Sequence, residues 1–357
     1  MFYEHGFTIF GQKNNPINES DVIVFSVPYE KYTSDSRGVL GGPLAVYNAS
    51  FKIDLLDEIT RQNPFENLAL HQSVFSEDRS FMHRSSDYPE TILNNLIKDM
   101  SEKFGKWKNP SKNRVISRNS EERFFTPFFI GIGGEHTVTY TFLNILKKSN
   151  IIKNIKDTTV VSIDSRYNLK DSENILFHDG KNSAFTHGCV MRRVHELGYK
   201  LMFIGQRNLS EEELKIIRSS EEDIIDIPYD KLGLLSQERP ENRCYDDILN
   251  KLKGDVYISI DMSALHTSIA PNVGLPSPNG GLLWSQLMYI LKRLFYLGTG
   301  RDRCINIIGM DIVEICPIKD QNITEMTAAL ILKKCLSFLT GDYAHFDNFH
   351  RAYKNFL

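Results

Sequence analysis

The chain has 357 residues, of which 41% are hydrophobic, and a formal net charge of -3 at pH 7. This length allows a large buried core, and the nearly balanced charge gives no reason to expect nucleic acid or an anionic membrane as a partner. The five cysteines form no CxxC pair, the first residues lack a secretory pattern and no apolar run could span a membrane, so we expect a soluble cytoplasmic protein.

The predicted elements alternate along the chain between strands and helices. Eight short runs rich in apolar and β-branched residues predict strands, at residues 22–27, 68–74, 128–132, 158–163, 201–205, 224–227, 256–260 and 305–310. Apolar stripes with helical spacing predict helices, over residues 92–104, 283–297 and 326–339. This order predicts an α/β fold with a mostly parallel sheet covered on both faces. Because no linker-like composition or internal repeat divides the sequence, we expect one domain over residues 1–357.

The segment 101–123 departs from this alternation. It contains seven Lys or Arg residues against three acidic ones, and Asn, Ser and Pro interrupt any periodicity. Such a charged, aperiodic stretch is typical of a solvated surface insertion, and a docking patch for an acidic partner is the alternative. Between residues 106 and 118, Trp107 is the only aromatic residue, which gives little support for nucleic-acid binding.

Four polar signatures follow four of the predicted strands, at residues 133–137, 162–171, 259–263 and 309–314. In an open parallel sheet the carboxyl ends of the strands meet at one edge, where such folds bind their ligands. The side chains there that could ligate a metal or transfer protons are His136, Asp164, Asp261 and Glu314. One imidazole with two carboxylates suits Mn²⁺ or Zn²⁺. A single Asp after a strand more often caps a turn, but four such residues together predict a site.

These signatures resemble those of the ureohydrolases, the family of arginase, agmatinase and formiminoglutamase. Gly-Gly-Glu-His-Thr at residues 133–137 is similar to the family's Gly-Gly-Asp-His-Ser, and Gly-Met-Asp-Ile-Val-Glu at residues 309–314 to its Gly-Leu-Asp-Ile-Val-Glu. Residues 263–282 follow the family's long signature, and Gly-Gly-Pro at residues 41–43 resembles its first helix start. The resemblance implies a three-layer α/β/α sandwich with an eight-stranded, mostly parallel sheet, assembled as a homotrimer or homohexamer.

The resemblance also implies a set of metal ligands, of which this chain retains half. Family members hold two Mn²⁺ ions with six side chains, and a hydroxide bridging the ions attacks a guanidinium or amidine carbon. Three of the six positions match, namely His136, Asp164 and Asp261. The other three are changed, to Arg166 in place of a His and to Asn168 and Ser263 in place of Asp.

These changes weaken one ion site and remove the other. By the family pattern, the first ion would keep the three matching ligands and a weak fourth one, Asn168. The second ion would lose both of its private ligands, because the guanidinium of Arg166 has no lone pair to offer and carries a positive charge. We therefore expect Arg166 to take the place of the second ion and to form charge-assisted hydrogen bonds to Asp164 or Asp261. No cofactor is expected in the purified protein, or else Mn²⁺ at one weak site.

The resemblance also implies roles for four residues that would act on or contact the substrate. His187 corresponds to a proton shuttle and Glu314 to the acid that grips the guanidinium, so both would be catalytic in an active enzyme. Ser183 and Arg207 lie where the family contacts its substrate. Neighbouring positions of that recognition loop are altered, to Phe185, Asn208 and Ser210. The identity of the substrate therefore does not carry over.

Three functions are consistent with this pattern. The preferred one is a catalytically inactive, arginase-like protein, metal-free or weakly metal-binding, retained for binding a small guanidino or carboxylated metabolite or for association between subunits. The first alternative is a hydrolase of C–N bonds in a guanidino or amidino compound that uses one metal ion. The second is a docking protein that acts through the basic segment 101–123.

Overall fold

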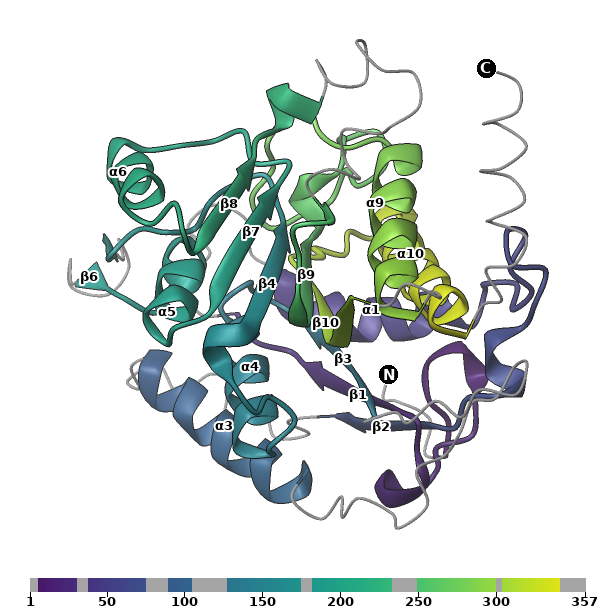
Figure 1. Ribbon diagram of the computed structural model, residues 1–357. Helices are drawn as coiled ribbons and strands as arrows, with labels where there is room; N and C mark the ends of the chain where they lie inside the picture. The colour runs from purple at the N-terminus through teal and green to yellow at the C-terminus, as the bar shows by residue number, and fades with distance from the viewer. Residues whose placement is uncertain are drawn as a thin grey trace, which may run out of the picture.

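The computed structural model describes residues 6–30, 38–74, 89–104, 127–174, 182–232, 249–299 and 304–340. Its centre is an eight-stranded sheet in the order β2-β1-β3-β10-β9-β4-β7-β8, in which all paired strands run parallel (Figure 1). The strands of this sheet are β1 (Val22–Val27), β2 (Leu70–Val74), β3 (Phe128–Gly133), β4 (Thr158–Ile163), β7 (Lys200–Ile204), β8 (Ile224–Ile227), β9 (Gly254–Asp261) and β10 (Ile305–Val313). A separate antiparallel pair consists of β5 (Glu173–Asn174) and β6 (Asn182–Ser183).

Helices cover both faces of the sheet, which makes the molecule a three-layer α/β/α sandwich (Figure 1). One face carries α1 (Gly42–Ser50), α9 (Trp284–Thr299) and α10 (Ile323–Thr340). The other carries α3 (Pro89–Phe104), α4 (Val138–Lys148), α5 (Val190–Glu196) and α6 (Glu211–Ser219). The predicted α/β fold and its parallel sheet are confirmed.

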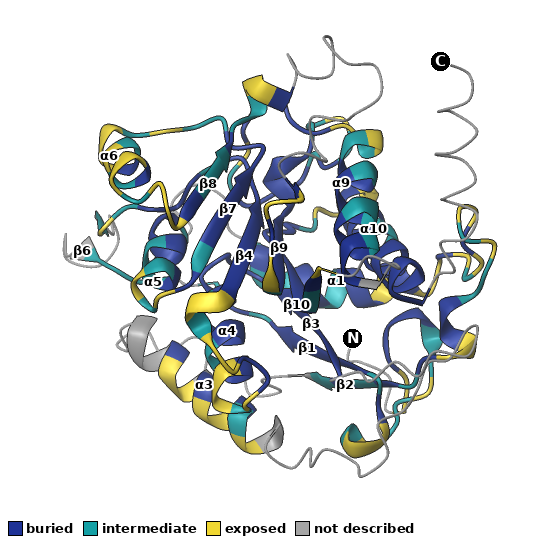
Figure 2. Ribbon diagram, in the orientation of Figure 1, coloured by how far each residue is buried: buried dark blue, intermediate teal, exposed yellow. Residues whose placement is uncertain are grey.

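Strands β1, β3 and β4 are buried along their whole length, as Figure 2 shows. This burial explains their sequences, because a parallel sheet covered on both faces selects continuous apolar runs rather than alternating ones. At Gly134 the loop after β3 passes close to the backbone that follows β1. A Cβ at this position would collide with the carbonyl oxygen of Tyr29, and the Gly134 N–H donates to Val27 O at 3.1 Å.

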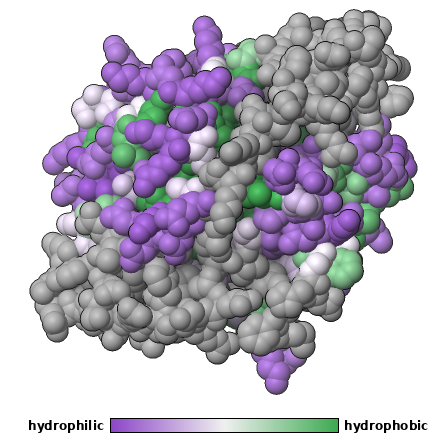
Figure 3. All heavy atoms as spheres, turned by 90° about the horizontal axis from the view of Figure 1, so that it is seen from below, coloured by the Kyte–Doolittle hydropathy of each residue, from purple (hydrophilic) through white to green (hydrophobic). Residues whose placement is uncertain are grey.

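Polar side chains predominate in the described part of the face shown in Figure 3. None of the helices in the described ranges combines the length and apolarity that a membrane crossing requires. Of the basic segment 101–123, the first four residues end α3, and residues 105–123 lie outside the described part of the chain.

Candidate metal and ligand site

Four adjacent strands, β3, β10, β9 and β4, bring their carboxyl ends together. His136 follows β3, Asp164 follows β4, Asp261 ends β9 and Glu314 follows β10. All four residues are buried. The structure therefore gathers these residues at the edge of the sheet where the sequence predicted a site.

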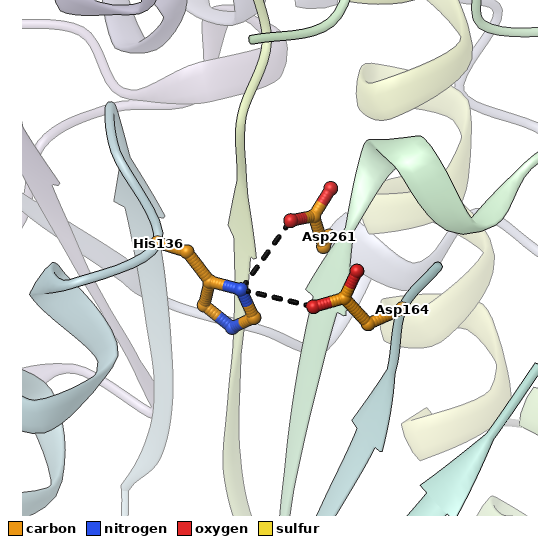
Figure 4. A group of neighbouring side chains, drawn as sticks. All are labelled: His136, Asp164 and Asp261. Carbon is orange, nitrogen blue, oxygen red and sulfur yellow. Dashed lines mark ion pairs between the residues drawn. The ribbon is translucent and has the colours of Figure 1, made fainter. Parts of the chain in front are cut away.

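His136 points its Nδ1 at the two Asp carboxylates, which face it from neighbouring strands (Figure 4). Its Nδ1 is 3.2 Å from Asp164 Oδ2 and 3.3 Å from Asp261 Oδ2. Burial opposes a charge on the imidazole, but hydrogen bonds and charges from both carboxylates outweigh it and raise the pKa of His136 well above its usual 6.5. A protonated His136 is therefore a cation that the two carboxylates can share.

The other ring nitrogen of His136 is held by Ser259 and Asp311. Nε2 lies 3.1 Å from Ser259 Oγ, which donates to Asp311 Oδ1 at 2.8 Å. Because the Ser259 hydroxyl gives its single proton to Asp311, it accepts the proton on Nε2. Nδ1 is then the nitrogen presented to the carboxylates or to a metal ion, an arrangement typical of metal-binding histidines.

Asn168 completes the cluster on the side of Asp164. Its Nδ2 donates to Asp164 Oδ2 at 2.8 Å and lies 3.3 Å from His136 Nδ1. In this orientation the amide donates hydrogen bonds, so it would have to turn its oxygen inward to ligate an ion. The backbone φ of Asn168 is 54°, a left-handed conformation that Asn tolerates better than most residues.

Ser263 belongs to a chain of hydroxyl groups that ends on Asp164. Ser263 Oγ donates to Asp164 Oδ1 at 3.3 Å and is 2.8 Å from Ser165 Oγ. Ser277 Oγ donates in turn to Ser165 Oγ at 2.9 Å. Neutral hydrogen bonds thus satisfy the side of Asp164 where the family resemblance implies a second ion.

The guanidinium of Arg166 does not bond to the carboxylates, and that expectation is wrong. Only the backbone N–H of Arg166 reaches Asp164, donating to Oδ1 at 3.0 Å. Among the described residues no hydrogen bond or ion pair joins its guanidinium to Asp164 or Asp261, and its Nε is buried without a partner. The physical reason is that backbone amides, His136 and the Asn168 and Ser263 side chains already satisfy both oxygens of Asp164.

Arg207 binds backbone carbonyls rather than a carboxylate. Its guanidinium donates to Ser263 O at 2.7 Å, to Ser277 O at 3.0 Å and to Ala264 O at 3.3 Å. It also lies over the ring of Tyr229, 5.9 Å from the centroid. Arg207 therefore ties the loop after β7 to the loop after β9, and its contact with a substrate stays a prediction.

Glu314 enters the site with a strained backbone. Its φ is 64°, a left-handed conformation that costs an ordinary residue about 1–3 kcal/mol. Its Oε1 accepts the backbone N–H of His136 at 2.7 Å, and a Cβ on Gly274 would collide with its Oε2. Burial raises the pKa of Glu314 well above its usual 4.5, and the charges of Asp261 and Glu135 act in the same direction.

His187 and Ser183 lie apart from this network of contacts. No hydrogen bond or ion pair within the described ranges links either residue to His136, Asp164 or Asp261. Ser183 Oγ instead accepts the N–H of Phe185 at 3.1 Å. His187 begins a 3-10 turn, and its Nδ1 is buried without a partner. Their roles in catalysis and substrate binding stay predictions.

Sequence reasoning missed the hydroxyl groups of Ser259, Ser165 and Ser277. A signal exists for Ser259, because residues two apart in β9 point to one face, which places it beside Asp261. No local signal exists for the other two. Ser165 and Ser277 are 112 residues apart and meet only because the loops after β4 and β9 converge.

The donor atoms fit one divalent ion but not two. One ligand atom each from His136, Asp164 and Asp261 lies within 4.8 Å of the others, the only such group of His, Cys, Asp or Glu in the described ranges. For a second ion the chain offers Arg166, which has no lone pair, and Ser263, whose hydroxyl already bonds to Asp164.

Comparisons with known proteins agree with this architecture. The N(1)-aminopropylagmatine ureohydrolase of Synechocystis sp. is 25% identical over 322 residues, which cover 90% of this chain and 89% of that protein. The proclavaminate amidino hydrolase of Streptomyces clavuligerus has a TM-score of 0.69 at 19% identity, covering 95% of this chain and 98% of that one. Trypanosoma cruzi formiminoglutamase, solved with Mn²⁺, has a TM-score of 0.66 at 12% identity, covering 93% and 97%.

The family model called arginase family matches residues 20–337. The match spans both ends of the eight-stranded sheet and all four strand ends that carry the site. On this evidence, the chain belongs to the arginase family.

Proposed function

We propose that this chain binds a small guanidinium or amidinium compound and does not hydrolyse it with a pair of metal ions. The proposal rests on the two positions that, by the family resemblance, would bind the second ion alone. Arg166 offers no lone pair, and Ser263 gives its proton to Asp164. The activity implied by the resemblance needs two ions, and this chain has ligands for at most one.

Glu314 supports a retained binding role. Its Oε1 is held by the amide of His136, whereas its Oε2 has no hydrogen-bond partner among the described residues. A planar cation with N–H donors would satisfy that oxygen with a charge-assisted hydrogen bond. We expect agmatine to raise the thermal unfolding midpoint of the metal-free protein, and Glu314→Gln to abolish that shift. An unchanged shift in the Glu314→Gln variant would show that the cation binds elsewhere.

The loss of hydrolysis is tested by restoring the ligands. With Mn²⁺, the natural chain should release no urea from agmatine or arginine above background. The triple variant Arg166→His, Asn168→Asp and Ser263→Asp should bind two Mn²⁺ ions per chain, because it regains every ligand that the resemblance assigns. A triple variant that folds and stays metal-free would show that these three positions are wrongly assigned.

A hydrolase that uses one ion is the second candidate, favoured by the convergence of His136, Asp164 and Asp261. An ion held there would act as a Lewis acid that polarises the bound amidine or a water molecule. This candidate predicts Mn²⁺-dependent release of urea, ammonia or formamide, lost in Asp261→Ala. Docking through the basic segment 101–123 stays a prediction, tested by deleting the segment and assaying partner capture by the folded protein.

A further inference from the structure

The two end strands of the sheet differ in how well their own sequences discourage pairing with another chain. β8, at one end, contains Asp226 and is followed directly by Pro228. β2, at the other end, reads Leu-His-Gln-Ser-Val and contains no proline, Lys, Arg, Asp or Glu. Charged residues and proline at an edge strand oppose the addition of a further strand. β8 therefore carries its own protection, and β2 does not.

Asn14 and Asn15 lie along the outer edge of β2. The backbone N–H and the side-chain Nδ2 of Asn15 both donate to Leu70 O, at 2.9 Å and 3.2 Å. The side-chain amide of Asn14 bonds to both backbone groups of Gln72. Its Oδ1 accepts the Gln72 N–H at 3.0 Å, and its Nδ2 donates to the Gln72 carbonyl oxygen at 3.1 Å. One side-chain amide thus takes the place of a peptide group in a neighbouring strand.

Gln72 is held through its side chain as well as its backbone. Its Oε1 accepts the N–H of Ile9 at 2.7 Å, and its Nε2 donates to Ser26 Oγ at 3.1 Å. Gln72 is buried, and with the two bonds to Asn14 each of its polar atoms has a partner. A buried polar group that loses its partner costs free energy, so the contacts with Ile9 and Asn14 stabilise this edge.

Two buried side chains anchor the segment formed by residues 6–15, which we call the N-terminal strap. Ile9 is fully buried, and the ring of Phe10 lies 5.0 Å from that of Phe65. The Phe10 N–H donates to Ser50 Oγ at 2.8 Å, which ties the strap to the end of α1. The strap is therefore fixed to the body of the protein at points separate from its asparagine contacts with β2.

We infer that the N-terminal strap is a strand mimic that blocks the edge of β2 against pairing with the β2 edge of a second copy of the chain. An uncovered edge presents a row of unpaired N–H and C=O groups, which is a template for another strand. A second copy carries the same uncharged strand, so no repulsion between charged β2 side chains opposes the pairing. Asn14 suits this role because its side-chain amide offers a donor and an acceptor together, as a peptide group does.

Hydrogen exchange and sedimentation velocity of the full chain test this inference. In Asn14→Ala the Gln72 N–H loses its acceptor, and it should exchange at least about 10-fold faster than in the natural chain, measured by residue-resolved mass spectrometry. As its concentration is raised, the same variant should form species heavier than those of the natural chain. Exchange of the Gln72 N–H at the natural rate, or the mass distribution of the natural chain at every concentration, would overturn the inference.

Two further variants serve as controls. Lys13→Ala changes an exposed side chain of the same strap and should match the natural chain in both measurements. Ser73→Lys, added to Asn14→Ala, places a charge on β2 and should remove the heavier species while the Gln72 N–H still exchanges fast. A double variant that keeps the heavier species would place the association at another surface and overturn the inference.

Discussion

At the scale of single residues, His136 is the centre of the site because both of its ring nitrogens are engaged. Nε2 is fixed by Ser259, and Nδ1 faces Asp164 and Asp261 at 3.2 Å and 3.3 Å. Two buried carboxylates this close together would repel each other without a cation between them. A protonated His136 would supply that cation in the absence of a metal ion.

Replacing His136 tests this account of the metal-free site. His136→Ala leaves two buried carboxylates without their shared cation, and breaking a buried ion pair in this way costs about 3–5 kcal/mol. We expect a loss of that size in the free energy of unfolding at pH 7, measured by urea denaturation. The matched variant is His266→Ala, where the imidazole bonds only to nearby Ser268 among the described residues, and it should change this free energy by less than about 0.5 kcal/mol. Equal effects of the two variants would contradict the account.

At the scale of elements, the sequence predicted the strands better than the helices. All eight predicted strands exist, and three of them have the bounds of β1, β4 and β8, because buried parallel strands carry short continuous apolar runs. The predicted helices correspond to α3, α9 and α10. The shorter helices α4, α5 and α6 were not predicted, although residues 138–146 show a helical apolar spacing.

Helix α10 also contains two buried lysines, Lys333 and Lys334, whose burial the sequence did not explain. Lys334 Nζ is 2.7 Å from Asp57 Oδ2 and also contacts Glu58. Lys333 Nζ lies 3.3 Å from the carbonyl oxygens of Asp54 and Leu56. The loop after α1 thus provides the partners for both ammonium groups, and the pairing anchors this loop to α10.

The pairing of Lys334 with Asp57 predicts a pH-dependent stability. Burial alone would raise the pKa of Asp57, but Lys334 and the amide of Thr60 outweigh it and lower the pKa below the usual 3.8. A lowered pKa in the folded state means that the interaction stabilises above pH 3.8 and is lost as the pH falls through the folded value.

Lys334→Met should therefore reduce the free energy of unfolding by about 1.5–3 kcal/mol at pH 7, the usual worth of a hydrogen bond to a charged group. The difference from the natural chain should shrink as the pH falls below 3.8, where Asp57 takes up a proton. Urea denaturation at a series of pH values measures this difference. A difference that stays constant down to acid pH would show that Lys334 stabilises through packing alone.

At the scale of the whole molecule, the sheet topology could be predicted from the sequence. The position of the Arg166 side chain and its bonding partners could not. Parallel strands bring their carboxyl ends to one edge, so the convergence of His136, Asp164 and Asp261 follows from the strand assignments. The direction of the Arg166 side chain depends instead on contacts between loops. Ser263 and Ser165, 98 residues apart, both donate to Oδ1 of Asp164, one of the two carboxylates expected to receive the guanidinium.

Assembly is a further prediction at this scale, which rests on the family resemblance. We propose that the chain forms a homotrimer or homohexamer. Multi-angle light scattering should then give three or six times the chain mass of 41.0 kDa. A mass of one chain at micromolar concentration would contradict this expectation.

We propose that this arginase-family chain cannot hold a pair of metal ions. The most direct test is the number of Mn²⁺ ions per chain, measured by plasma mass spectrometry after incubation with excess Mn²⁺ and removal of the free ion. Because His136, Asp164 and Asp261 supply ligands for a single ion, we predict no more than one ion per chain, and none in His136→Ala. Two ions per chain would contradict the account and would place a working second site beside Arg166.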